Sequence, residues 1–112
     1  MEKKQASIEL RKIYKSISDD NVNFKVDRNQ RYDSIGNVNV DRYCRVVVSI
    51  CPYQKNHVKN YNFIETIIHE MLHIVYPNKQ ENEIEQLGID VFSNLGDKQI
   101  QNLLIKVSDR FI

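Results

Sequence analysis

Two histidines stand four residues apart in the segment His69-Glu70-Met71-Leu72-His73, and a glutamate follows the first of them. Residues four apart on a helix lie on one face, one turn above the other, so both imidazoles can reach one metal ion. A glutamate beside the first histidine lies to the side of that ion, where it can act on a bound water molecule. The spacing predicts zinc as the cofactor, His69 and His73 as ligands, and Glu70 as general base.

The surrounding sequence favours this interpretation. On a helix with His69 at 0°, His73 falls at about 40° and Glu70 at about 100°. The apolar residues of the same helix spread from about 140° to about 300°, and they are Ile64, Ile67, Ile68, Met71, Leu72, Ile74 and Val75. The helix is therefore expected to bury one broad face and to present the three polar residues on the other. The alternative is two surface histidines beside a glutamate that has no role.

A catalytic zinc site needs a third protein ligand and leaves a fourth position for water. The chain has three histidines, and the third, His57, lies upstream on a predicted loop. No histidine follows His73, and Tyr76 occupies the position at which the metzincin extension has glycine. The third ligand is therefore expected to be a carboxylate from the helix that follows Tyr76.

That helix offers three glutamates near its start, Glu81, Glu83 and Glu85. Glu81 lies three residues before Ile84 and extends the apolar stripe of the helix, whereas Glu83 points away from it. A short turn would bring Glu81 beside His73, so we expect Glu81 as the ligand and Glu85 as a partner that supports a ligand. The choice between Glu81 and Glu85 stays open, and either acid can instead be a solvated group favoured by the helix dipole.

The segment HEMLHIVYPNKQENEIEQLGIDVF resembles gluzincin metallopeptidases, in which a glutamate on a separate helix completes the zinc site. The short single-domain chain looks most like the minigluzincins, which are minimal soluble scaffolds similar to the catalytic domains of integral-membrane peptidases. In gluzincins an acid often follows the ligand glutamate by four residues. Glu81 and Glu85 match that interval, with Glu where Asp is usual. The resemblance covers roughly residues 43–95 and implies zinc-dependent hydrolysis of peptide bonds.

Two further expectations come from this resemblance. Minigluzincins are zymogen-like, so the helix at 98–111 and its end at 110–112 are candidates for covering the cleft, although the helix can equally complete the core. The strand at 45–50 resembles the upper-rim strand of zincins, along which an extended peptide substrate adds as a further strand. An additional donor to the oxyanion is common in such sites, and Tyr76, Tyr53 and His57 are the candidates.

The remaining periodicity predicts the elements that must position these residues. Amphipathic spacing predicts helices at 2–18, 62–76, 80–95 and 98–111. Alternating or β-branched residues predict strands at 22–26, around 38–40 and at 45–50, although the middle one can belong to a wide loop. Another alternating stretch lies around 32–35. We expect one small α+β domain of residues 1–112, zincin-like, with a three-stranded, mostly antiparallel sheet covered by helices.

Composition excludes several other classes of protein. The 112 residues carry a formal net charge of +1, which argues against a nucleic-acid footprint because phosphate binding needs clustered positive charge. The chain has no apolar run of the roughly 20 residues that a membrane-spanning helix needs, and its first residues lack the apolar core of a signal peptide. We therefore expect a cytoplasmic protein in which Cys44 and Cys51 are free thiols. Its oligomeric state stays open.

Two other functions remain compatible with the sequence. The chain can be a non-catalytic zinc-binding module that acts through contacts with other proteins, or a metal-free α+β interaction domain. Glu70 distinguishes the first of these from a peptidase, because holding a metal requires only the ligands. A peptide or protein substrate is the expected partner if the chain is an enzyme.

Overall fold

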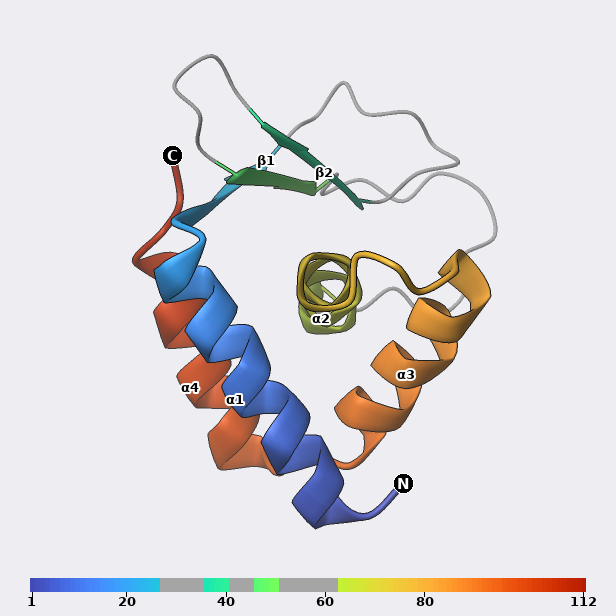
Figure 1. Ribbon diagram of the computed structural model, residues 1–112. Coiled ribbons are helices and arrows are strands. Elements are labelled where there is room, and N and C mark those ends of the chain that lie inside the picture. The colour runs from blue at the N-terminus through green and yellow to red at the C-terminus, as the bar shows by residue number, and fades with distance from the viewer. Residues whose placement is uncertain (27–35, 41–45, 51–62) are drawn as a thin grey trace, which may run out of the picture.

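The computed structural model describes residues 1–26, 36–40, 46–50 and 63–112, and the elements lie in the order helix, three strands, three helices (Figure 1). They are α1 (Lys3–Asp19), β1 (Val22–Val26), β2 (Gly36–Val40), β3 (Val46–Ile50), α2 (Phe63–Val75), α3 (Glu81–Ser93) and α4 (Asp97–Ser108). The α+β class is as expected. Several residues named above lie outside the described ranges: the stretch 32–35, Cys44, Cys51, Tyr53 and His57.

The four helices appear where periodicity predicts them. In α1, Leu10, Ile13 and Ile17 recur at helical spacing and are almost completely buried. In α2, five apolar residues and two polar ones are buried, and they are Ile64, Thr66, Ile67, Ile68, Glu70, Met71 and Leu72. The last helix ends at Ser108 rather than at residue 111, because the chain then turns to run along β1.

The sheet is mixed rather than mostly antiparallel, and this corrects the prediction. Its strand order is β1-β3-β2. The β1 and β3 strands pair in parallel, with Val22 opposite Val46, whereas β2 and β3 pair antiparallel, with Val38 opposite Val48. Residue alternation predicts which face a strand buries but carries no information on which strand lies beside it. Residues 38–40, for which both a strand and a wide loop were possible, form part of the β2 strand.

The strand pairing bears on the strand at 45–50, along which a peptide substrate was expected to add. Because β3 is hydrogen-bonded to β1 on one side and to β2 on the other, it has no free edge to accept another chain. Among the described residues, β1 and β2 are the outer strands, and the outer side of β1 carries an isolated bridge between Phe24 and Phe111. The strand at 45–50 is therefore central in the sheet and lacks the free edge that the resemblance implies.

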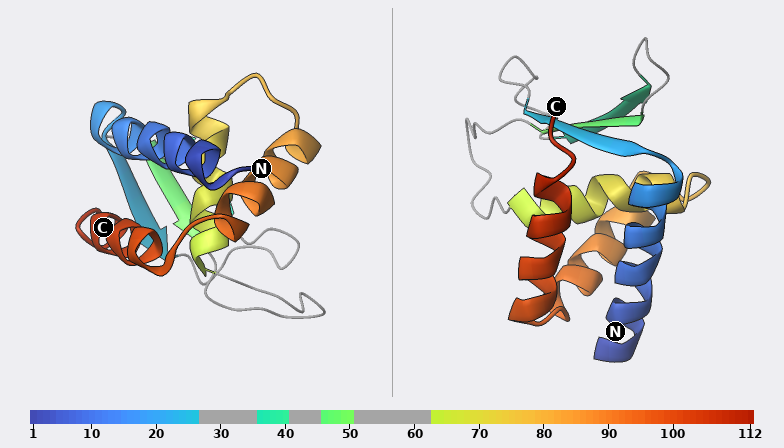
Figure 2. Two further views of the ribbon diagram at one scale, coloured as in Figure 1. Left: turned by 90° about the horizontal axis from the view of Figure 1, so that it is seen from below. Right: turned by 90° about the vertical axis from the view of Figure 1, so that its left-hand side faces the viewer.

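The helices surround α2 beneath the sheet. Figures 1 and 2 show α1 and α4 on one side of α2 and α3 on the other, with the sheet across one end of the group. Apolar residues from all four helices and the sheet form one core, including Phe24, Met71, Ile84 and Leu103, which are fully buried. This arrangement places α2 and α3 side by side, which is what positions the predicted ligands. None of the helices in the described part of the chain combines the length and the apolar character needed to cross a bilayer.

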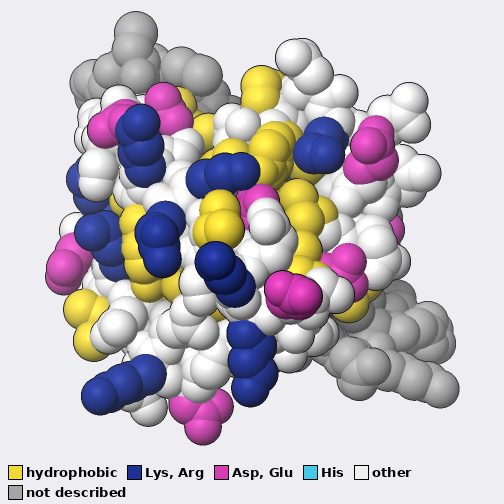
Figure 3. Space-filling view, turned by 60° about the horizontal axis from the view of Figure 1, so that its bottom comes forward, with side chains coloured by type: hydrophobic (Ala, Val, Ile, Leu, Met, Phe, Trp, Pro, Cys, Tyr) yellow, Lys and Arg dark blue, Asp and Glu magenta, His cyan; other side chains and the backbone are white. Residues whose placement is uncertain are grey.

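Charged side chains cover part of the apolar surface of the helices. On the face shown in Figure 3, apolar side chains gather near the middle, and Lys and Arg side chains lie over and between them. One such contact joins α4 to α1, where Lys106 Nζ lies 5.3 Å from the centroid of the Tyr14 ring. Long basic side chains commonly cover apolar groups in this way while their charges stay in water.

The end of the chain extends the sheet. The backbone N–H of Phe24 donates to the carbonyl of Arg110 at 2.9 Å, and the N–H of Ile112 donates to the carbonyl of Phe24 at 2.9 Å. The Phe111 ring lies 6.0 Å from the Phe24 ring and 6.3 Å from the Phe63 ring. This segment lies on the opposite side of α2 from α3 (Figure 1). The last helix contributes Leu103 and Val107 to the core, whereas Phe111 and Ile112 stay 39% and 52% exposed beside β1. Neither the helix nor its end lies over the surface between α2 and α3 (Figure 1).

Deleting Phe111 and Ile112 should lower the free energy of unfolding by on the order of 2 kcal/mol, through loss of two aromatic contacts and of a hydrogen bond to β1. Urea denaturation followed by circular dichroism measures this change. As a control, Ile105→Ser replaces an apolar residue of α4 that is 62% exposed, and the change should stay within about 0.5 kcal/mol. A deletion that increased peptide hydrolysis would instead favour a segment that occludes the cleft.

Candidate metal centre

Helix α2 presents its two histidines together. The ring centroids of His69 and His73 are 4.9 Å apart with an angle of 70° between the planes, and their Nε2 atoms are 3.2 Å apart. Their side chains are 23% and 29% exposed. Both rings therefore extend out of the apolar core and lie close enough to each other to contact the same ion or carboxylate. This is the arrangement that the i, i+4 spacing predicts.

Helix α3 supplies the carboxylate. Glu81 is its first residue, and its two oxygens divide between the histidines: Oε1 lies 2.7 Å from His69 Nε2, and Oε2 lies 2.8 Å from His73 Nε2. The backbone N–H of Gln80 donates to Glu83 Oε1 at 3.2 Å, which anchors the start of the helix. Glu83 therefore serves the helix end, and Glu81 is the acid that meets both imidazoles.

The three side chains fit a zinc ion by donor type, and the two imidazoles also fit it by the separation of their nitrogens. Their ligand atoms lie within 4.8 Å of one another, and among the described residues these three form the cluster able to hold a metal. Two imidazole nitrogens and one carboxylate oxygen form a ligand set used in catalytic zinc sites. Zinc–nitrogen bonds of about 2.0–2.1 Å in a tetrahedron separate two nitrogens by about 3.3 Å. The 3.2 Å between the Nε2 atoms is close to that separation, whereas the Glu81 oxygens lie at the hydrogen-bond distances of 2.7 and 2.8 Å from the same nitrogens.

Glu70 lies beside the cluster without belonging to it. The residue is only 7% exposed. Burial raises the pKa of its carboxyl from 4.5 to about 7, while nearby His69 lowers this pKa and the charge of Glu81 raises it. An acid with a pKa close to neutrality can both accept and return a proton at physiological pH, which suits the role predicted for Glu70.

Gly88 is the residue of α3 that lies against His69 of the ligand helix, and sequence reasoning missed it. A Cβ atom at this buried position would lie 3.7 Å from His69 Cα and 3.9 Å from Leu72 Cδ1. Gly88 follows Glu81 by seven residues, so the two share one face of α3, with Ile84 between them. A glycine on the apolar stripe of an otherwise helical segment was the signal that could have identified this contact.

The other candidate residues do not join the cluster. Glu85 is exposed, and it is not among the residues whose ligand atoms converge. The Tyr76 hydroxyl donates to Glu9 Oε2 at 2.7 Å, so its proton is directed toward α1. Tyr53 and His57 lie outside the described residues. Among the candidates for the oxyanion, the structure thus describes only Tyr76 and shows its proton already engaged.

Comparison of this chain with models of known protein families, with curated proteins and with solved structures gave no match. The gluzincin resemblance therefore stays an expectation, carried by the segment from His69 to Glu81. Physical support for a metal site comes from the convergence of two imidazoles and one carboxylate at the surface between α2 and α3.

Proposed function

We propose that this chain is a zinc-dependent peptidase of the gluzincin type with a minimal zincin-like fold. The observation that carries the proposal is the meeting of His69 Nε2, His73 Nε2 and the Glu81 carboxylate at 2.7 to 3.2 Å. A carboxylate from a separate helix that reaches both histidines of an H-E-x-x-H segment provides three ligands and leaves room for a fourth. Glu70, buried next to the first ligand, supplies the general base.

Zinc held by this group would lower the pKa of a bound water and polarise the carbonyl of the scissile peptide bond. Glu70 takes the proton of the attacking water on its carboxylate and returns it to the leaving amine. Its ionised form is favoured beside a cation, because an opposite charge offsets the burial that raises its pKa. His69, His73 and Glu81 hold their positions through the backbone of two adjacent helices.

The edge of β2 is the place where an extended peptide would bind. In the described part of the sheet β2 pairs only with β3, so the backbone groups on its other side can bond to an added strand. Helix α2 packs against both β2 and β3. A peptide at this edge would therefore lie on the side of the sheet nearest the ligand helix.

Purified protein should bind about one zinc ion per chain, as expected for a site with three protein ligands. His73→Ala and Glu81→Ala should each weaken zinc binding at least about tenfold, because each removes one ligand. Elemental analysis after dialysis and competition with a chromophoric chelator measure both quantities. Glu85→Ala is the matched control on α3 and should bind zinc like the wild type. A Glu81→Ala variant with unchanged affinity would exclude this ligand set.

Glu70→Gln should keep zinc and lower the rate of peptide hydrolysis by about 10²-fold or more, because the amide cannot accept the proton. A fluorogenic peptide library measures hydrolysis, and zinc content is measured on the same sample. Glu85→Gln changes an exposed acid of α3 that lies outside the cluster, and it should leave the rate unchanged. If Glu70→Gln retained full function while His69→Ala abolished it, the chain would be a zinc-binding module that is not an enzyme.

In the metal-free protein, the burial of Glu70 should make the free energy of unfolding depend on pH. The folded carboxyl has a pKa of about 7 against 4.5 ordinarily, so between these values the folded state binds more protons than the unfolded state. The free energy of unfolding should therefore fall as the pH rises through this range. Relative to Glu70→Gln, the metal-free wild type should lose stability from pH 4.5 to pH 7. Parallel slopes in urea titrations of the two proteins would contradict this prediction.

A further inference from the structure

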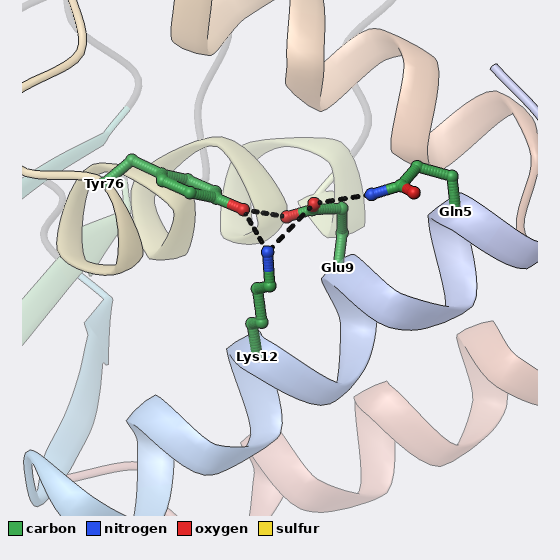
Figure 4. A network of polar contacts seen from close by, with 4 residues as sticks. All are labelled: Gln5, Glu9, Lys12 and Tyr76. Atoms are coloured by element: carbon green, nitrogen blue, oxygen red, sulfur yellow. Dashed lines mark hydrogen bonds and ion pairs between the residues drawn. The ribbon is translucent and has the colours of Figure 1, made fainter.

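Tyr76 links the end of the ligand helix to α1. Its hydroxyl donates to Glu9 Oε2 at 2.7 Å and accepts a hydrogen bond from Lys12 Nζ at 2.7 Å (Figure 4). Burial raises the pKa of the Tyr76 hydroxyl, which keeps it protonated as a donor. In the sequence, Tyr76 lies 64 residues from Lys12 and 67 residues from Glu9. It is thus a tertiary contact rather than a local turn.

Glu9 is a buried acid that the proposed reaction does not use. It is 4% exposed, yet both of its carboxylate oxygens have partners. Oε1 accepts from Gln5 Nε2 at 3.1 Å and from Lys12 Nζ at 3.4 Å, and Oε2 accepts from Tyr76. Burying a carboxylate is unfavourable unless it is paired and hydrogen-bonded. Glu9 can therefore be buried because of these partners, and among the described residues Tyr76 is the partner that comes from outside α1.

Tyr76 occupies the junction between the two parts of the metal centre. Its backbone N–H donates to the carbonyl of Leu72 at 2.8 Å and so continues α2 by one residue. Its carbonyl accepts from the N–H of Lys79 at 3.2 Å, and Lys79 Nζ lies 5.1 Å from its ring centroid. Tyr76 follows His73 by three residues and precedes Glu81 by five. The turn between α2 and α3, which separates His73 from Glu81, therefore packs against the Tyr76 side chain.

We propose that Glu9 and Tyr76 are positioning residues of the metal centre, which fix the turn between α2 and α3 and thereby the place where Glu81 meets His69 and His73. This inference rests on the proposed zinc site. The side chain of Glu81 is 66% exposed, so burial of the carboxylate does little to hold it in place. Groups that orient the ligands of a metal site typically change its affinity by about 10- to 100-fold when removed.

Tyr76→Phe keeps the ring and removes the hydroxyl, and it should raise the dissociation constant for zinc about tenfold. Glu9→Gln keeps the shape of the carboxyl and should act in the same direction. Tyr76→Phe removes the donor of this contact and Glu9→Gln removes the charge of its acceptor. Because both variants weaken the same contact, the double variant should bind zinc about as well as the weaker single variant. Chelator competition measures affinity, and the visible absorption of the cobalt-substituted protein reports whether ligand geometry has changed. Thermal unfolding of the metal-free proteins is recorded in parallel.

Ser7→Ala provides a matched control on the same helix. It removes a hydrogen bond of 3.0 Å from Gln99 Nε2 that joins α4 to α1, and it should leave zinc affinity and the cobalt spectrum unchanged. If the Tyr76 and Glu9 variants lowered only the unfolding temperature and kept wild-type zinc affinity, the proposal would be overturned. Glu9→Gln alone decides the question if Tyr76→Phe does not fold. A wild type that binds no zinc would instead overturn the proposed function itself.

Discussion

The contact of one carboxylate with two imidazoles sets the geometry on which the candidate site depends. Glu81 reaches His69 and His73 with separate oxygens, so the first residue of α3 must lie within a few ångströms of two successive turns of α2. This requirement constrains both the turn between the helices and their separation. The rest of the fold can be understood by asking what satisfies that requirement in a chain of 112 residues.

Two buried acids of the chain have different surroundings and suit different roles. Glu9 accepts hydrogen bonds from Gln5, Lys12 and Tyr76, and the bond from Tyr76 ties α1 to the turn. Burial raises the pKa of Glu70 to about 7, and the nearby charges of His69 and Glu81 act in opposite directions. A carboxyl held in a satisfied network is suited to positioning, whereas one whose protonation is finely balanced is suited to proton transfer.

Local periodicity predicted most residues of the candidate site, but few of the tertiary contacts that hold those residues in place. The histidines and Glu70 follow from helix geometry, and Glu81 follows from a short turn, because both depend on residues close in sequence. The order of the strands and the parallel pairing of β1 with β3 depend on contacts that no local pattern encodes. The role of Glu9 was nonetheless signalled, since it shares a helix face with Ala6 and Ile13, where an acid is unusual. A charged residue on an apolar face predicts a buried partner, although its identity requires the fold.

The ligand geometry is held by backbone elements rather than by burial of the ligands themselves. His69, His73 and Glu81 are all partly exposed, and exposed side chains lose conformational freedom when they are fixed. The movement of these three ligands is limited by contacts of the helices and of the turn that carry them. The packing of α3 on α2 brings Gly88 against His69, the Gln80–Glu83 bond anchors the start of α3, and Tyr76 ties the turn to α1. Each support acts on the main chain, so a bound cation would need to order only three side-chain ends whose origins are already fixed.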